Sequence, residues 1–118
     1  MLSLPPSVRI FVARGATDQR QSFDGLCALA NDVLRQDPSS GHVFVFFGRR
    51  RARVKLLVWD RSGFWVFAKR LEAGSFAEVR VAGAAACIEV SSRDLLLLLE
   101  GIELSEWRQR RRYDRSVA

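Results

Sequence analysis

The segment from His42 to Leu71 constrains the fold most, because it reads as three apolar strands joined by short turns. "HVFVFF" is apolar on both faces, which is typical of a strand covered on both sides. "VKLLVW" and "FWVFAKRL" follow, separated by "DRSG", whose Asp and Gly fit a type I turn with a glycine bulge. The segment therefore predicts an antiparallel meander over about residues 42–71, at the centre of a mostly antiparallel β-sheet.

The "DRSG" turn sets a register for the last two strands, because side chains alternate between the two faces of a strand. That register predicts three opposed pairs: Trp59 and Trp65, Leu57 and Phe67, and Lys55 and Lys69. One face of the hairpin would then carry aromatic side chains interleaved with lysines. Such a face suits either base stacking with single-stranded nucleic acid or packing beneath a helix, and the sequence leaves both interpretations open.

Elements on the N-terminal side of the meander extend the fold. "VRIFVA" alternates in the manner of a strand. Apolar spacings of three and four predict a helix over about residues 18–36, ended by Asp37-Pro38. Its N-cap is Thr17, Asp18 or Ser22, each of which supplies an oxygen for free backbone N–H groups.

Elements on the C-terminal side are shorter. "EVRV" and "CIEV" read as two short strands. A second helix over about residues 92–100 opens at Ser91, with Asp94 three residues on, and stops at Gly101. We therefore expect an α+β fold in which the sheet packs against two helices.

The 118 residues, 48% of them hydrophobic, suffice for one compact domain. We expect a single α+β domain over residues 1–107 and a basic tail or short helix over residues 108–118. No apolar run reaches the length of a membrane span and no secretory signal is evident, so we expect a cytoplasmic protein without membrane contact. Cys27 and Cys87 are expected as reduced, buried thiols. With His42 as the single histidine, neither a metal nor a cofactor is expected.

Charge is distributed unevenly along the chain, whose net charge is +6. Residues 43–71 carry +7 and residues 108–118 carry +4, whereas residues 72–107 carry −5. Seventeen of the nineteen basic residues are Arg, which can bind phosphate or carboxylate through two parallel hydrogen bonds. The acidic segment could also support self-association by meeting the basic hairpin of a second copy.

The Arg-rich tip between the first two strands of the meander is the main candidate site. No acidic residue lies between Val43 and Trp59 to neutralise it. The tip predicts either phosphate binding or a solvated turn that protects the hairpin from pairing with other edges. The candidate nucleic-acid-binding residues are Arg49, Arg50, Arg51, Arg53, Lys55, Arg61, Lys69 and Arg70. A second basic set, either a nonspecific arm or a solubilising terminus, is Arg108, Arg110, Arg111 and Arg112.

No catalytic constellation is expected. A nuclease would need two or three carboxylates converging on metal ions. Asp18, Asp24 and Asp60 are the acids available, and each has a structural explanation at a helix start or a turn. His42 has no G-x-S-x-G element to work with. A small nuclease is kept as a third interpretation, which requires those aspartates to meet in one pocket.

Three stretches carry a resemblance to a known family: "VRIFVARGATDQRQSFDGLCALA", "GHVFVFFGRRRARVKLLVWDRSGFWVFAKRLEAGSF" and "EVSSRDLLLLLEGIEL". From about Val8 to Leu104, in order and spacing, the chain resembles the small TnpB-type accessory protein. Bacterial insertion sequences of the sixty-six family, which are mobile elements, encode that protein beside their transposase. The resemblance assigns no catalytic residue, and residues 77–87 and the Arg-rich tail depart from the family pattern.

The resemblance implies a role in DNA transposition, a form of DNA recombination, alongside a separate transposase. Together with the basic hairpin, it favours a non-catalytic accessory protein that contacts DNA phosphates with little reading of bases. The alternative is a protein–protein adaptor that docks on the transposase without touching DNA.

Overall fold

The computed structural model describes residues 7–101, which form one β-sheet with helices on both faces. The elements are β1 (Ile10–Ala13), α1 (Phe23–Asp32), the short 3-10 helix η1 (Pro38–Ser40), β2 (Val43–Phe47), β3 (Arg53–Trp59), β4 (Phe64–Arg70), β5 (Cys87–Val90) and α2 (Ser92–Leu99). The expected α+β class is confirmed.

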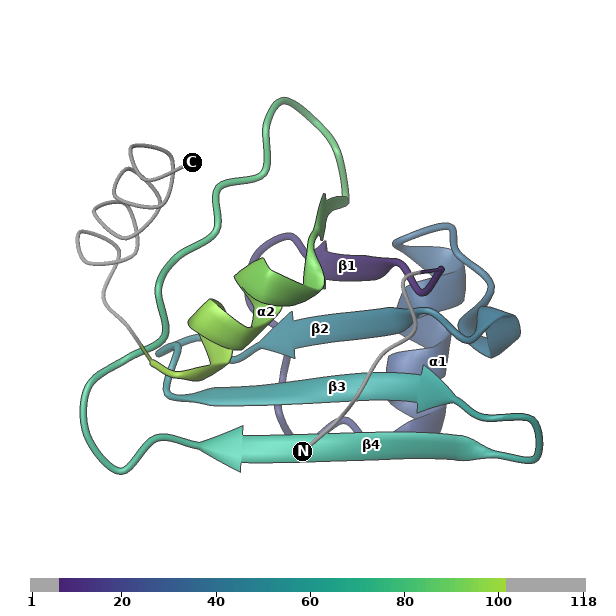
Figure 1. Cartoon of the computed structure of the whole chain (residues 1–118), viewed down its shortest axis with the longest axis horizontal. Coiled ribbons are helices and arrows are strands. Elements are labelled where there is room, and N and C mark those ends of the chain that lie inside the picture. Colours follow the sequence, from purple (N-terminus) through teal and green to yellow (C-terminus); the bar gives the residue numbers. More distant parts are fainter. Residues whose placement is uncertain (1–6, 102–118) are drawn as a thin grey trace.

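The strands lie in the order β4-β3-β2-β1-β5 (Figure 1). The pairs β2–β3, β3–β4 and β1–β5 are antiparallel, and only β1–β2 is parallel. A parallel pair needs a crossover connection, and α1 lies in it. The meander of residues 42–71 supplies three of the five strands, so the mostly antiparallel sheet is confirmed.

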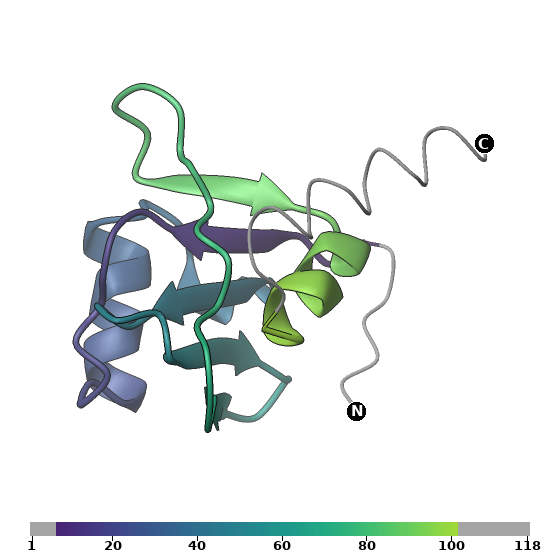
Figure 2. The same cartoon turned by 90° about the vertical axis from the view of Figure 1, so that its left-hand side faces the viewer.

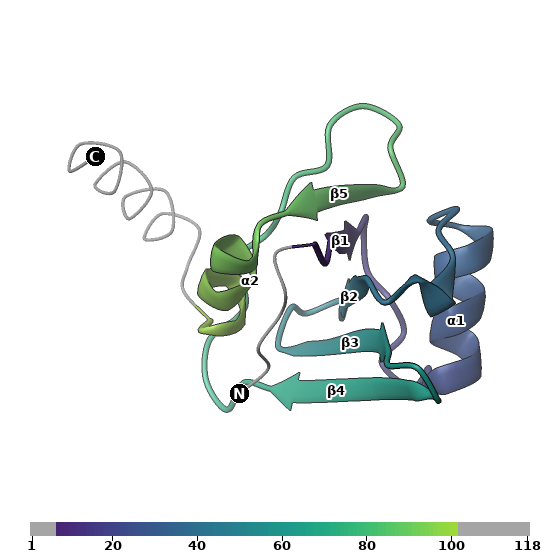
Figure 3. The ribbon, with the colours of Figure 1, turned by 45° about the vertical axis from the view of Figure 1, so that its right-hand side comes forward.

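The two helices cover opposite faces of the sheet (Figures 2 and 3). Strand β1 shows how the alternation of side chains achieves this. Phe11 packs with Leu26 of α1 on one face, whereas Ile10 packs with Leu95 of α2 on the other. All five residues of β2 are buried, as expected for a central strand whose two faces are both covered.

The register predicted for the β3–β4 hairpin is wrong by one residue. Val58, not Trp59, lies opposite Trp65. The reason is the turn, which has no bulge: the Asp60 N–H donates to the Gly63 carbonyl at 3.0 Å. These two residues therefore face each other across a two-residue turn, and every later pair shifts by one position.

The shifted register separates the aromatic residues that the sequence had placed together. Trp59 packs edge-on against Phe64, 4.9 Å between ring centroids, on the face that α1 covers. Trp65 stacks with Phe67 on the α2 face, 5.9 Å between centroids. The single aromatic and lysine face predicted for this hairpin therefore does not exist.

Helix α1 is shorter than predicted at both ends. It begins at Phe23 rather than near residue 18, and Ser22 is its N-cap without a side-chain hydrogen bond. It ends at Asp32, because Arg35 takes a left-handed conformation with φ 56° before the proline is reached.

The C-terminal predictions fare differently. The stretch 78–81 is not a strand, but β5 and α2 lie close to their predicted positions. Ser91 Oγ accepts a hydrogen bond from the Asp94 N–H at 3.0 Å, and Gly101 has φ 76°, so the predicted start and stop of α2 are confirmed. Within residues 7–101, neither helix is long and apolar enough to cross a bilayer.

Candidate nucleic-acid interface

The connection between β2 and β3 forms a tight tip that presents two arginines to solvent. The Gly48 N–H donates to the Arg53 carbonyl at 2.9 Å, and the Arg51 N–H donates to the Gly48 carbonyl at 3.0 Å. This closed turn leaves Arg49 and Arg50 exposed. Neither has a hydrogen-bond or ion-pair partner among residues 7–101, as the sequence predicted for this tip.

Arg51 differs from its two neighbours, because its side chain turns inward. The guanidinium donates to the backbone carbonyls of Phe76 and Ala77 and lies 4.3 Å from the centroid of the Phe47 ring. Burial lowers the pKa of Arg51, partly offset by the charge of Glu78. The side chain therefore anchors the 71–86 connection, which crosses the end of the sheet from β4 to β5 (Figure 2).

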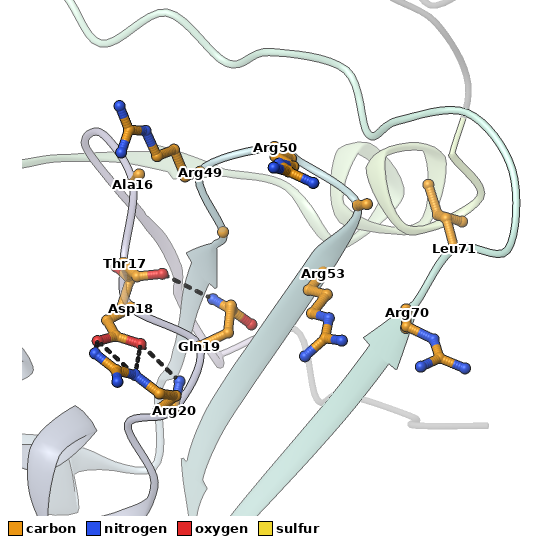
Figure 4. Close-up of a pocket in the computed structure, with 12 residues that line it drawn as sticks. Ala16, Thr17, Asp18, Gln19, Arg20, Arg49, Arg50, Arg53, Arg70 and Leu71 are labelled. Carbon is orange, nitrogen blue, oxygen red and sulfur yellow. Dashed lines mark hydrogen bonds and ion pairs between the residues drawn. The ribbon is translucent and has the colours of Figure 1, made fainter.

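Beside the tip lies a hollow of about 740 Å³ (Figure 4). Arg53 and Arg70 are directly opposite each other on β3 and β4 and extend side by side along one wall. Like charges in this arrangement destabilise a sheet. The residues that line the hollow are Ala16, Thr17, Asp18, Gln19, Arg20, Gly48, Arg49, Arg50, Ala52, Arg53, Arg70 and Leu71.

We call the space lined by those twelve residues the cationic hollow. Its far wall is the segment 16–20. Gln19 fixes it, because its side-chain amide donates to the Phe46 carbonyl at 3.0 Å. Gly48 allows the close approach: a Cβ there would lie 2.9 Å from Gln19 Cγ. Sequence reasoning assigned this segment to a helix start and missed its place beside the tip, which only the fold brings about.

Acidic groups compensate little of the positive charge in the hollow. Within residues 7–101, Asp18 is the one carboxylate that lines it, and that group is paired with Arg20 at 2.7 Å. Hydrogen bonds from Arg20 lower the pKa of Asp18 to about 2. Arg70 contacts Glu72 at 3.0 Å, but both side chains are mostly exposed, so this pair contributes little. Arg53 has neither a hydrogen-bond partner nor an ion-pair partner for its side chain within residues 7–101.

The remaining candidates of the hairpin do not line the cationic hollow. Lys55 donates to the Gln21 carbonyl at 2.8 Å on the α1 side of the sheet. Lys69 donates to the Leu99 carbonyl on the α2 side. Arg61 lies in the turn at the other end of β3 and β4, with φ 69°. The structure thus brings Arg49, Arg50, Arg53 and Arg70 together in the cationic hollow. A second hollow of about 360 Å³ shares Arg53 and Arg70 with it and is also lined by Lys55 and Lys69, whereas Arg61 lines neither.

The basic tail residues Arg108, Arg110, Arg111 and Arg112 lie outside the described residues. So does the expected division between a domain over residues 1–107 and a tail over residues 108–118.

The three aspartates of the nuclease interpretation are far from a common site. Asp18 lies at the hollow, whereas Asp60 lies in the turn beyond β3 and accepts a hydrogen bond from the Trp65 indole N–H. Asp24 is in the first turn of α1. Within residues 7–101, no three His, Cys, Asp or Glu side chains are grouped so that they could hold a metal ion.

The single histidine and the two cysteines have structural surroundings. His42 Nδ1 accepts a hydrogen bond from the Arg9 N–H at 2.9 Å. Cys27 and Cys87 are free thiols that are half-buried rather than fully buried. Burial, followed by the charges of Asp24 and Glu89 respectively, raises the pKa of each thiol, which disfavours the reactive thiolate.

Fold and site together define a small α+β protein that carries a basic hollow at one end of its sheet. The chain belongs to the family described as IS66 Orf2 like protein, whose pattern matches residues 8–109. This family is associated with transposition of IS66 insertion sequences. The resemblance drawn from the sequence is therefore confirmed over most of the chain.

Two curated relatives come from Sinorhizobium fredii strain NGR234. "Uncharacterized protein y4hO" is 37% identical over 108 residues, which cover 92% of this chain and 90% of the relative. "Uncharacterized protein y4jC" is 34% identical over 103 residues, which cover 87% of this chain and 86% of the relative. No solved structure matches the chain significantly.

Proposed function

We propose that this protein is a non-catalytic accessory factor of IS66 transposition that binds DNA through its cationic hollow. The observation that carries the proposal is the convergence of Arg49, Arg50, Arg53 and Arg70 on one hollow, in which the only carboxylate from the described part of the chain is already paired. Family membership supplies the context of a transposing DNA element.

Phosphate is the ligand that suits this arrangement best. Arg presents a planar fork of donors that matches two phosphate oxygens, and neutralising a phosphate releases condensed counterions. The opposed pair of Arg53 and Arg70 gains further, because an anion between two like charges relieves their repulsion. Such contacts position a protein on DNA and carry little base specificity.

The element's separate transposase would carry out strand cleavage and joining. That transposase is the protein partner we expect, and we expect the two proteins to meet in the cytoplasm. The role of this chain would be to hold DNA near that enzyme, with the Arg49–Arg50 tip and the Arg53–Arg70 wall contacting the backbone.

Duplex binding measured by fluorescence anisotropy at low salt tests the proposal. The test variants are Arg49→Ala/Arg50→Ala and Arg53→Ala/Arg70→Ala. The matched control is Arg35→Ala/Arg61→Ala, which also removes two positive charges, but from exposed positions that do not line the hollow. We expect each test variant to lose about tenfold or more in affinity, since each phosphate contact to Arg is charge-assisted, and the control to lose much less.

Equal losses of duplex affinity in all three variants would show that only the net charge matters, and would overturn the proposed site. Absence of duplex binding by the wild type at low salt, with purified transposase still captured, would favour the adaptor interpretation. In that case the same arginines would meet acidic groups on the transposase, and the hollow variants would lose capture instead.

A further inference from the structure

Among residues 7–101, strand β4 forms the longer of the two edges of the sheet. It spans seven residues, pairs with β3 without interruption and contains no proline or bulge, two of the devices that prevent an edge from pairing with another chain. Its charged residues, Lys69 and Arg70, stand only at its C-terminal end. Because β4 is the first strand in the spatial order, β3 is its one neighbouring strand among the described residues (Figure 1).

The α2 face of β4 carries two large exposed aromatic side chains. Trp65 is 55% exposed and Phe67 is 38% exposed, and their rings are nearly parallel at 16°. The Trp65 indole N–H donates to Asp60, which fixes the ring. Figure 3 shows α2 lying over one end of the sheet, away from the turn at which β4 starts, so this helix does not cover the pair.

The backbone groups that point out from the β4 edge follow from two hydrogen bonds at its ends. The Asp60 N–H bonds the Gly63 carbonyl, and the Leu71 N–H bonds the Ala52 carbonyl. Antiparallel pairs alternate between bonded and non-bonded positions. The odd-numbered residues of β4 therefore bond β3, and the N–H and C=O groups of Phe64, Val66, Ala68 and Arg70 face outward.

We propose that a second copy of this chain occupies this edge, through antiparallel β4–β4 pairing around a two-fold axis at Phe67. In that register, Val66 of each copy exchanges backbone hydrogen bonds with Ala68 of the other. Phe67 faces Phe67 in a non-bonded pair, where side chains approach most closely. The pairing is self-complementary, as a two-fold interface requires.

Charge favours this occupant and this direction. The β4 strand has aromatic residues at its start and Lys69 and Arg70 at its end. Antiparallel pairing around Phe67 sets Lys69 of one copy against Trp65 of the other, a cation–π arrangement. Parallel pairing in register would instead set the cations against each other, which is unfavourable.

This pairing does not depend on the proposed DNA contacts, but it places them. A two-fold axis normal to the sheet keeps both cationic hollows on the same face. With Arg70 opposite Phe64 of the other copy, the two Arg70 positions are six residues apart along the strands, or about 20 Å.

Sedimentation velocity of the full chain over about a hundredfold dilution series tests the proposal. We expect a species of about twice the 13.4 kDa chain mass that dissociates on dilution. The key variant is Ala68→Pro, which removes an outward N–H without breaking the β3–β4 ladder. It should be monomeric with an unchanged circular dichroism spectrum. Val33→Ser, which removes an apolar side chain at the end of α1 that is about as exposed as Trp65, should keep the dimer.

A disulfide test checks the register separately from stability. Under mild oxidation, Phe67→Cys should give a covalent dimer, because residues in opposed non-bonded pairs are close enough for a disulfide. Trp65→Cys should not, since two copies of that position lie four residues apart in the proposed register. Wild type reports any cross-linking through the native thiols.

A wild type that stays monomeric at the highest concentration overturns the proposal. So does an Ala68→Pro variant that dimerises with unchanged affinity. Cross-linking through Trp65→Cys but not Phe67→Cys would contradict the register. A wild type that dimerises but does not bind duplex DNA at low salt would refute the hollow alone, so the two proposals fail separately.

Discussion

Replacing Arg51 by alanine separates the structural arginine of the tip from those proposed to bind DNA. The substitution removes hydrogen bonds to the Phe76 and Ala77 carbonyls and the contact with the Phe47 ring. Hydrogen bonds from charged donors contribute roughly 1.5–3 kcal/mol each, and a half-buried site lies at the lower end of that range. Since alanine also carries a Cβ, the cost of φ 56° is unchanged. We expect a loss of about 2–3 kcal/mol in the free energy of unfolding.

The assay is urea unfolding followed by tryptophan fluorescence, with Arg50→Ala as the control. Arg50 is exposed and unpaired within residues 7–101, so its removal should change stability by less than about 0.5 kcal/mol. Arg51→Met, which retains an apolar stem beside Phe47, should recover part of the loss. Equal stability of Arg51→Ala and Arg50→Ala would refute the argument that Arg51 anchors the 71–86 connection.

Further predictions concern the core, the hollow and a helix cap. Leu57→Ala leaves a cavity at a fully buried position and should cost about 2–5 kcal/mol in urea unfolding. Asp18→Asn releases Arg20 and should tighten duplex binding, with a salt slope steeper by about 0.9 for one added phosphate contact. By NMR, the Asp18 carboxyl should titrate with a pKa of about 2. Its pair with Arg20 therefore stabilises the folded state fully above the ordinary aspartate pKa, and this stabilisation is lost as the pH falls through about 2. In Arg20→Ala the pKa should return toward its ordinary value. Ser91→Ala should cost about 1 kcal/mol in thermal unfolding, through loss of the α2 cap.

Most of the fold follows from patterns local to the chain. The apolar run of β2 predicted a strand buried on both faces, and Ser91 and Gly101 predicted the ends of α2, because these signals depend only on neighbouring residues. The hairpin register failed because it depended on the turn type. Asp60 and Gly63 fit both a bulged and an unbulged turn, and φ 69° at Arg61 selects the unbulged one.

The candidate site was predictable only in part. Counting charges locates the Arg-rich tip, but not which arginine turns inward, because the carbonyls that hold Arg51 come from Phe76 and Ala77, 25 and 26 residues away. The wall contributed by residues 16–20 likewise depends on a contact between segments distant in sequence, where Gln19 reaches the Phe46 carbonyl. Opposition of Arg53 and Arg70 needed the correct register, which the sequence did not provide.

The salt dependence of duplex affinity for wild type and Arg53→Ala/Arg70→Ala tests the central claim most directly. Each arginine that neutralises a phosphate contributes about 0.9 to the slope of log affinity against log salt, so the double variant should be shallower by about 1.8. An Arg35→Ala/Arg61→Ala control should keep the wild-type slope. An unchanged slope in the hollow variant, or no duplex binding by the wild type at low salt, would contradict the account.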